Sequence, residues 1–482
     1  MSWFKVVLSS LRYYRGINLS VLAGVALTSA TLSGSFVVGD SVKESLRRNA
    51  EARLSRLGLV MVGGERFVSS SLADRVMESE GWDGVVAPIL QIEATASNRA
   101  SGQRANKVQI LGVDERFWEM SNSGEVPEGF NQENWIGINQ PLANRIDAGI
   151  DDTLILRIEL PAALSRDAPL SGESEQTTPF TAKVTSVLNA DQFGLFSLRA
   201  EQVPPSTLFV RMSRLESILE QPGRANILAV AVGSDAAAFA DAVQASWNLE
   251  DLQLSVSEVE GDGTKQLVSS RVFFDDAIVN SLQERASKVA PVLTYLATDI
   301  KSGDSSTPYS MVTGVAPNLN GIVEDSLPDD GIILSDWVAE DLGAAPGDKV
   351  TLVYNVVGTG RILTEQERSF VVNKISPLGE FGWDDSWTPA FPGIFDVDDL
   401  DDWEPGIPIN RDKIRDKDDE YWDQYRATPK AFVSLSAAKE MWSNRFGSVT
   451  AVRFRDTGSV AQLDDQLRQS LHLEDLGIAF RD

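Results

Sequence analysis

The sequence has no cysteine and one histidine, His472. Disulfides, cysteine nucleophiles and thiolate metal sites are therefore excluded, and zinc lacks its usual ligands. A Ser-His-Asp triad would have to use His472, which begins the segment His472-Leu-Glu-Asp-Leu. That segment matches Asn248-Leu-Glu-Asp-Leu earlier in the chain. Because the matching position holds an amide, we interpret His472 as structural.

The sequence also lacks the glycine-rich motifs that bind phosphates. Neither Gly-x-x-x-x-Gly-Lys-Ser/Thr nor Gly-x-Gly-x-x-Gly occurs, so any ATP hydrolysis belongs to a partner chain. Ser436 and Lys439 fit the Ser-x-x-Lys pattern of penicillin-binding enzymes, but the accompanying motifs are absent. We interpret Ser436 as the cap of a helix over 437–444, and Ser459 as the cap of a later one. The sequence predicts a protein without catalytic residues or a cofactor.

Basic residues are scarce beyond the N-terminal region. The formal net charge is −27, although residues 1–60 hold eight Lys or Arg against three Asp or Glu. The remainder of the chain is therefore strongly acidic. An acidic surface repels phosphate backbones, so we expect no nucleic-acid partner.

Only one long apolar run is present, from Ile17 to Val38, and it contains no charged residue. As a helix it would be about 33 Å long, which is enough to cross the hydrocarbon core of a bilayer. We predict a transmembrane helix over 17–38. The alternative is a cleaved secretory signal, because Lys5, Arg12 and Arg15 precede the run and small residues occur near its end.

This run is unusually rich in small and polar residues. Gly24 and Thr28 are four residues apart, and so are Ser29 and Ser33. Small residues at this spacing let helices approach closely in a membrane. We expect these four residues to pack against other membrane helices, supplied by other chains or by a continuation of this one.

Helical patterns flank the run on both sides. Residues 2–14 place their apolar side chains on one face, as expected for a helix lying in the bilayer interface. Residues 40–57 keep a helical period, and no proline separates them from the run, which predicts one continuous rod. Basic residues lie on both sides of the run, so orientation is weakly encoded. The acidic remainder favours an N-terminus on the cytosolic side of the cytoplasmic membrane and a large domain in the periplasm or outside the cell.

An internal repeat organises the rest of the chain. The matching segments keep the same order in both copies: Ala87-Pro-Ile-Leu with Ala290-Pro-Val-Leu, Trp135-Ile-Gly-Ile-Asn with Gly331-Ile-Ile-Leu-Ser, and Pro205-Ser-Thr-Leu-Phe-Val with Thr428-Pro-Lys-Ala-Phe-Val. Collinear matches at long period indicate a duplicated unit. The spacing between matches grows late in the chain, which places an insertion at 376–427.

The predicted fold class is therefore α+β, with one N-terminal transmembrane helix and stalk before an ectodomain of two related α+β repeats. The expected parts are an amphipathic segment at 1–16, a transmembrane helix at 17–38, a stalk helix at 39–60, repeat 1 at 63–257, and repeat 2 at 266–482 with its insertion.

The insertion contains four tryptophans and many acidic residues. A long loop with this many tryptophans is expected to be packed, and the alternative is a surface for a partner. Its densest carboxylate run could bind Ca²⁺ but lacks the EF-hand spacing, so a solvated acidic loop is preferred. The run comprises Asp396, Asp398, Asp399, Asp401 and Asp402.

Together these parts resemble the FtsX-like and MacB-like permeases of ABC transporters. The resemblance rests on Phe4 to Leu27, on the stalk segment Gly39-Asp-Ser-Val-Lys-Glu-Ser-Leu, and on segments such as Val108-Gln-Ile-Leu-Gly-Val-Asp-Glu-Arg-Phe-Trp. It implies mechanotransmission, in which a cytosolic ABC-type ATPase moves membrane helices and thereby a periplasmic domain. It also implies a dimer.

Permeases of this kind carry further transmembrane helices after the ectodomain, whereas this sequence stops at Asp482. We therefore expect a truncated or split permease that needs helices from elsewhere. The alternative function is a membrane-anchored extracytoplasmic domain that binds a partner without an ATPase.

Overall fold

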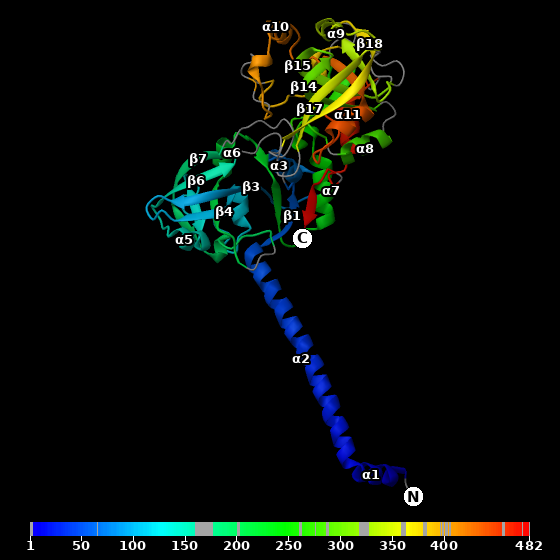
Figure 1. Ribbon diagram of the computed structural model, residues 1–482. Helices are drawn as coiled ribbons and strands as arrows, with labels where there is room; N and C mark the ends of the chain where they lie inside the picture. The colour runs from blue at the N-terminus through cyan, green and yellow to red at the C-terminus, as the bar shows by residue number, and fades with distance from the viewer. Residues whose placement is uncertain are drawn as a thin grey trace.

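The computed structural model describes residues 3–481 except 65, 160–176, 200–202, 260–262, 275, 286–288, 318–326, 358–362, 379–382, 396, 398–399, 401–402, 404–405, 456–457 and 475. A long N-terminal helix carries a broad folded part at its C-terminal end (Figure 1). We call this helix, α2 (Arg15–Leu54), the rod, and residues 57–481 the body. A short helix, α1 (Trp3–Tyr13), precedes the rod and turns away from it (Figure 1).

The rod is one uninterrupted helix of 40 residues, about 60 Å long at 1.5 Å per residue. No break separates the predicted membrane segment from the predicted stalk. The predicted end of the stalk at residue 60 is wrong, because α2 ends at Leu54 and strand β1 begins at Leu57. The sequence Leu57-Gly-Leu-Val-Met-Val is almost wholly apolar, and as a strand it is paired on both sides.

The body is mixed α and β and contains two large sheets. The first has the strand order β21-β1-β11-β3-β4-β9-β5-β8, with β6 paired to β3 and β7 paired to β6. Its strands are β1 (Leu57–Val62), β3 (Val86–Asn98), β4 (Arg104–Val113), β5 (Ile136–Asn139), β6 (Thr153–Glu159), β7 (Thr177–Lys183), β8 (Ser186–Leu188), β9 (Thr207–Arg211), β11 (Ile227–Ala231) and β21 (Ala479–Arg481). A separate small pair joins β2 (Val68–Ser69) to β10 (Arg224–Ala225).

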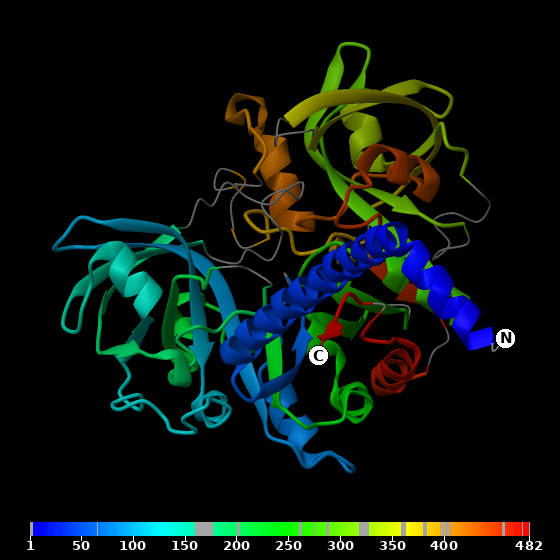
Figure 2. The same ribbon diagram turned by 90° about the horizontal axis from the view of Figure 1, so that it is seen from below.

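The second sheet has the order β12-β13-β20-β14-β15-β19-β16-β18-β17, with β17 also paired to β14. Its strands are β12 (Leu254–Glu258), β13 (Lys265–Ser269), β14 (Val289–Ser302), β15 (Ser305–Val315), β16 (Gly331–Ser335), β17 (Lys349–Val357), β18 (Leu363–Ser376), β19 (Ala431–Ser434) and β20 (Ala451–Phe454). The β14–β17 pairing closes six of these strands into a barrel. In the first sheet, the consecutive neighbours β3, β4, β9, β5 and β8 follow a similar curved path (Figure 2).

The two sheets share a pattern of neighbours and directions. In the first, β3 is antiparallel to β4, β4 is parallel to β9, and β9 is antiparallel to β5. In the second, β14, β15, β19 and β16 repeat that series of directions. We call residues 57–258 the first half and residues 265–481 the second half. A duplication of sequence stays a prediction, since a shared strand order does not by itself show common descent.

The halves exchange their last strands. β12 ends the first half but pairs with β13 of the second sheet, and β21 ends the second half but pairs with β1 of the first. Helices from both halves pack into the hydrophobic core at the centre of the body. They are α3 (Ser71–Glu78), α7 (Ala236–Ser246), α8 (Asp276–Arg285) and α12 (Val460–Ser470).

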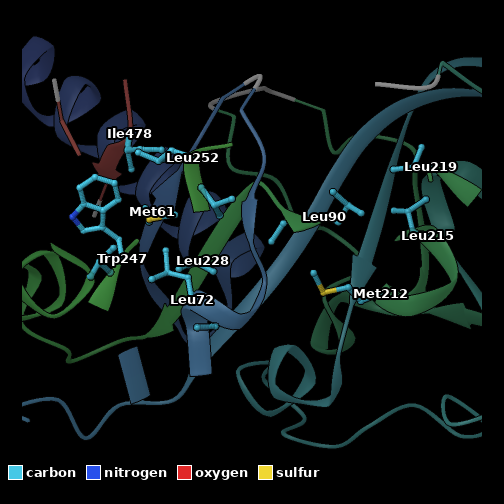
Figure 3. Close-up of a cluster of buried hydrophobic side chains, with 14 of the residues drawn as sticks. Met61, Leu72, Leu90, Met212, Leu215, Leu219, Leu228, Trp247, Leu252 and Ile478 are labelled. Carbon is cyan, nitrogen blue, oxygen red and sulfur yellow. The ribbon is translucent and has the colours of Figure 1, made fainter. Parts of the chain in front are cut away.

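The largest hydrophobic core lies in this central region and draws on both halves. Met61, Leu228 and Trp247 of the first half lie near Ile478 of the second, and the core continues past Leu90 toward Met212 and Leu215 (Figure 3). The remaining helices cover the outer parts: α4 (Glu115–Glu119), α5 (Gln140–Ile146), α6 (Met212–Ile218), α9 (Asp336–Leu342), α10 (Asp416–Tyr425) and α11 (Leu435–Trp442). The exchange and the shared core make the halves one body.

Candidate membrane anchor and its joint with the body

Within the described part of the chain, α2 is the one helix long and apolar enough to cross a membrane. Its large apolar side chains face solvent; Leu27 and Phe36, for example, are each 72% exposed. The apolar side chains of α1 are likewise exposed, including Trp3 at 84%. Exposed apolar surface of this extent is typical of a helix covered by lipid or by other helices. These observations are consistent with a membrane-anchored protein.

The predicted packing residues lie on two faces of α2. Gly24 and Thr28 are about one turn apart on one face, and Ser29 and Ser33 are one turn apart on another. A Cβ added to Gly24 would have no atom within 4 Å, so that face is open. The Thr28 hydroxyl donates to the Gly24 carbonyl at 2.9 Å. This polar group is thus satisfied inside the helix, as a lipid environment requires.

The rod meets the body over residues 53–58, which we call the joint. Arg53 is buried, and Leu54 packs against a cluster of buried aromatic residues in the first half. Ser55 then has a φ of 54° and a ψ of −119°, a conformation that glycine adopts more readily than serine. Such conformations persist only where the surrounding structure fixes them. The change from helix to strand is therefore held in place by its neighbours.

Hydrogen bonds tie the next residue, Arg56, to two parts of the first half. Its backbone N–H donates to the Met120 carbonyl at 3.1 Å, and its guanidinium donates to the Glu119 carbonyl. Its own carbonyl accepts from Val232 N–H at 2.6 Å. The joint is thus fastened to the C-terminal end of α4 and to the end of β11.

Gly58 allows the closest approach in the joint. A Cβ at this position would lie 2.6 Å from the Cα of Val232, which is too close for any side chain. The pairing of β1 with β11 shifts register here, between Leu57 and Leu59. Bulges of this kind redirect a strand. The sequence alone did not identify Gly58 or Arg56 as contacts of the joint, although a glycine at the end of the predicted helical period was a usable signal.

Beyond the joint, the rod continues into β1, the second strand from one edge of the first sheet. β1 is antiparallel to β11 of the first half and to β21 of the second. Met61, for example, lies opposite Leu228 on one side and Phe480 on the other. A displacement of the rod therefore reaches strands of both halves through backbone hydrogen bonds.

The four tryptophans of the insertion are buried, which confirms that it is packed. They are Trp383, Trp387, Trp403 and Trp422, with exposures between 0 and 5%. Trp387 packs under the guanidinium of the buried Arg453, whose Nε donates to Gln266 at 2.8 Å. The predicted carboxylate run at 396–402 lies outside the described residues. Among the residues that are described, no group of His, Asp and Glu could hold a metal ion.

Buried charges hold the insertion against the second barrel. Arg415 contacts Asp341 of α9 at 2.8 Å and Asp418 at 2.7 Å, and both carboxylates are almost completely buried. Lys430 Nζ lies 4.6 Å from the ring centroids of both Trp337 and Tyr421, and 3.8 Å from Asp418. Burial lowers the pKa of Lys430 to about 8, although Asp418 acts to raise it.

Two further residues considered in the sequence analysis, His472 and Ser436, are placed by the structure. His472 is exposed and lines a cleft of about 390 Å³ between α7 and α12, with Gln244 and Arg468. Gln244 bonds the backbone of the segment around His472, accepting from Leu473 N–H at 3.1 Å. The prediction that Ser436 caps its helix is wrong: Ser434 is the cap of α11, and Ser436 lies within it. Ser434 ends β19, so the helix starts two residues earlier.

One polar cleft of about 400 Å³ lies where β4 and β9 end, beside α3 and α6. Its Arg116 bonds both Asp74 and Asp114 at 2.6 Å. Burial raises the pKa of Asp114 despite this pairing, and burial also raises the pKa of Glu216. The cleft has carboxylates and guanidiniums but no histidine, so its described residues do not form a Ser-His-Asp arrangement.

No protein family matches this sequence, and no curated protein matches it. Among solved structures, the chain is similar to the periplasmic region of MacB from Actinobacillus actinomycetemcomitans, with 10% identity and a TM-score of 0.27 over 42% of this chain and 86% of that one. It is also similar to the extracellular domain of the ABC-type transporter YknZ from Gram-positive bacteria, with 11% identity and a TM-score of 0.25 over 41% of this chain and 92% of that one. TM-scores of this size do not establish a family.

Proposed function

We propose that this chain is a permease subunit of an ABC transporter, or the N-terminal part of one, which couples a cytosolic ATPase to an extracytoplasmic body. The observation that carries the proposal is the rod itself: α2 runs from the predicted membrane segment to the joint, and the chain then enters the body as strand β1, which is paired with a strand of each half. A helix without a break transmits displacement along its axis. The resemblance of the sequence to FtsX-like and MacB-like permeases points the same way.

In this proposal the body lies on the far side of the cytoplasmic membrane and α1 lies in the interface. The chain contributes no catalytic group, and the energy comes from the ATPase. Gly24, Thr28, Ser29 and Ser33 contact further transmembrane helices of the permease. Two copies of the assembly form a dimer, as the resemblance implies.

Co-purification from native membranes tests the proposal. A tag on the body of the full chain should recover an ABC-type ATPase and a polypeptide with several transmembrane helices. Recovery of the chain alone, or with extracytoplasmic proteins only, would contradict ATPase coupling and support an anchored binding domain. An unrelated single-span protein with the same tag controls for nonspecific recovery.

A variant pair tests the packing residues. Gly24→Leu fills the open face of α2 and should reduce recovery of the multi-span partner at least fivefold, since a large side chain keeps helices apart. Leu27→Ile, at a neighbouring exposed position, should leave recovery unchanged. Equal recovery with both variants would show that Gly24 does not face the partner.

A further inference from the structure

The hydrogen bonds and close contacts of Leu54, Arg56 and Gly58 fasten the rod to the first half, whereas β21 of the second half pairs with β1. Every joint contact described above belongs to the first half: Leu54 with the aromatic cluster, Arg56 with Glu119 and Met120, and Gly58 with Val232. The second half contributes β21, whose three residues pair with Val60, Met61 and Val62, above the joint.

We propose that the joint is a rigid coupling, so that α2 and the first half move as one unit and the second half follows through the exchanged strands. This inference rests on the proposed mechanotransmission for its biological use, but the rigidity itself can be measured without an ATPase. It names Gly58 and Arg56 as the positioning residues of the coupling.

Three observations favour a rigid joint over a hinge. Ser55 holds a conformation that a freely moving serine would leave, which requires that its neighbours fix it. Arg56 uses both its backbone and its side chain to bond the C-terminal end of α4. Gly58 brings β1 so close to Val232 that the two segments cannot slide past each other without separating. A hinge would have few contacts and unrestrained backbone.

In the first half, the joint packs against a cluster of buried aromatic residues. Helix α4, whose C-terminal end accepts the hydrogen bonds of Arg56, carries Phe117 and Trp118, which are fully buried. Their rings contact Phe193 and Phe209 at centroid distances of 4.3 and 5.4 Å. Leu54 and Leu57 of the joint belong to this same cluster. A force on the rod is therefore applied to a close-packed core rather than to a surface loop.

The absence of cysteine allows the rigidity to be measured by spin labels at introduced cysteines in the full chain, reconstituted in lipid nanodiscs. Leu46→Cys on the rod and Ile150→Cys on the first half, both exposed, report the angle between rod and body. Ile150→Cys and Lys374→Cys report the distance between the halves. We expect a narrow rod-to-body distance distribution in the native joint.

Gly58→Val should broaden that distribution at least twofold, and Arg56→Ala should broaden it by less, while the distribution between the halves stays unchanged. The unchanged second distance shows that each variant remains folded. Arg47→Ala, on an exposed face of the rod, should change neither distance. A rod-to-body distribution that is already broad in the native joint, or that neither variant broadens, would overturn the inference. Both results are independent of whether an ATPase co-purifies, so the two proposals can fail separately.

Discussion

The two halves of the body fasten their long loops by different chemistry, although their strands have corresponding orders. The first half covers one face of its sheet with aromatic rings, among them Phe117, Trp118 and Phe193. The second half packs its insertion with buried tryptophans and adds buried charges, centred on Asp341, Asp418 and Lys430. Aromatic burial does not depend on pH, whereas a buried lysine titrates. The same framework can therefore carry loops of very different sensitivity.

The largest effect is expected in the aromatic cluster. Trp118→Ala removes a fully buried indole and should lower the free energy of opening of the first half by about 3–5 kcal/mol. Hydrogen exchange of β4 and β9 measures this. Trp3→Ala, at an exposed position of α1, is the control and should leave exchange unchanged. Unchanged protection of β4 in Trp118→Ala would show that the cluster is not the core of this half.

Asn139 caps α5 in the first half, and Ser335 caps α9 at the matching position of the second half. Asn139 is fully buried and makes four hydrogen bonds, two as donor and two as acceptor, to Gly194, Pro205, Leu142 and Thr207. Ser335 Oγ accepts from Val338 N–H alone at 3.2 Å. Asn139→Ala should cost about 2–4 kcal/mol because several buried groups lose partners, and Ser335→Ala about 1 kcal/mol. Equal losses in hydrogen-exchange protection of the two halves would contradict this difference.

Lys430 makes a pH dependence specific to the second half. Its folded pKa of about 8 is below its ordinary value of 10.5, so between these values the unfolded chain binds a proton that the folded chain has lost. The free energy of unfolding should therefore rise as the pH rises from about 8 to about 10.5. Lys430→Met should remove this rise. At pH 7 it should leave the free energy of unfolding unchanged or raise it by up to about 3 kcal/mol.

Chemical denaturation across this pH range, followed by tryptophan fluorescence, measures the slope. Lys374→Met, at an exposed position of β18, is the matched control and should keep the native slope. A native slope in Lys430→Met would place the titration elsewhere.

The smallest effect is expected on the rod. Glu44 pairs with Arg47 at 3.2 Å and Arg48 at 2.9 Å, and all three side chains are exposed. Glu44→Gln should change the stability of this part of α2 by less than about 0.5 kcal/mol, and the difference should vanish at high salt. Hydrogen exchange of residues 43–51 at two salt concentrations tests this. A large, salt-independent loss would show that Glu44 has a partner beyond the rod.

The sequence predicted features that arise from local patterns. The apolar period gave the continuous rod, and Ser459 was correctly predicted as the cap of α12, where it accepts from Gln462 N–H. The burial of the insertion followed from its tryptophans. These predictions succeed because each depends on residues close together in the chain.

What depends on distant residues was not predicted. The exchange of β12 and β21 joins segments from opposite ends of the body, and no local pattern encodes it. The stalk was predicted to extend to residue 60 because residues 40–57 keep a helical period without a proline, whereas tertiary contacts end the helix at Leu54. The joint was missed for the same reason, since Arg56 and Gly58 matter only through Met120 and Val232.

The pairing of β1 with β21 has a consequence for biogenesis. β1 is among the first parts of the body to be synthesised, yet one of its partners lies at the far end of the described chain. During synthesis, this apolar strand has an unpaired edge until nearly the whole body has been made. Exposed apolar edges aggregate, and pairing between distant segments is slow. Maturation of the protein therefore depends on protecting its first strand until its last one arrives.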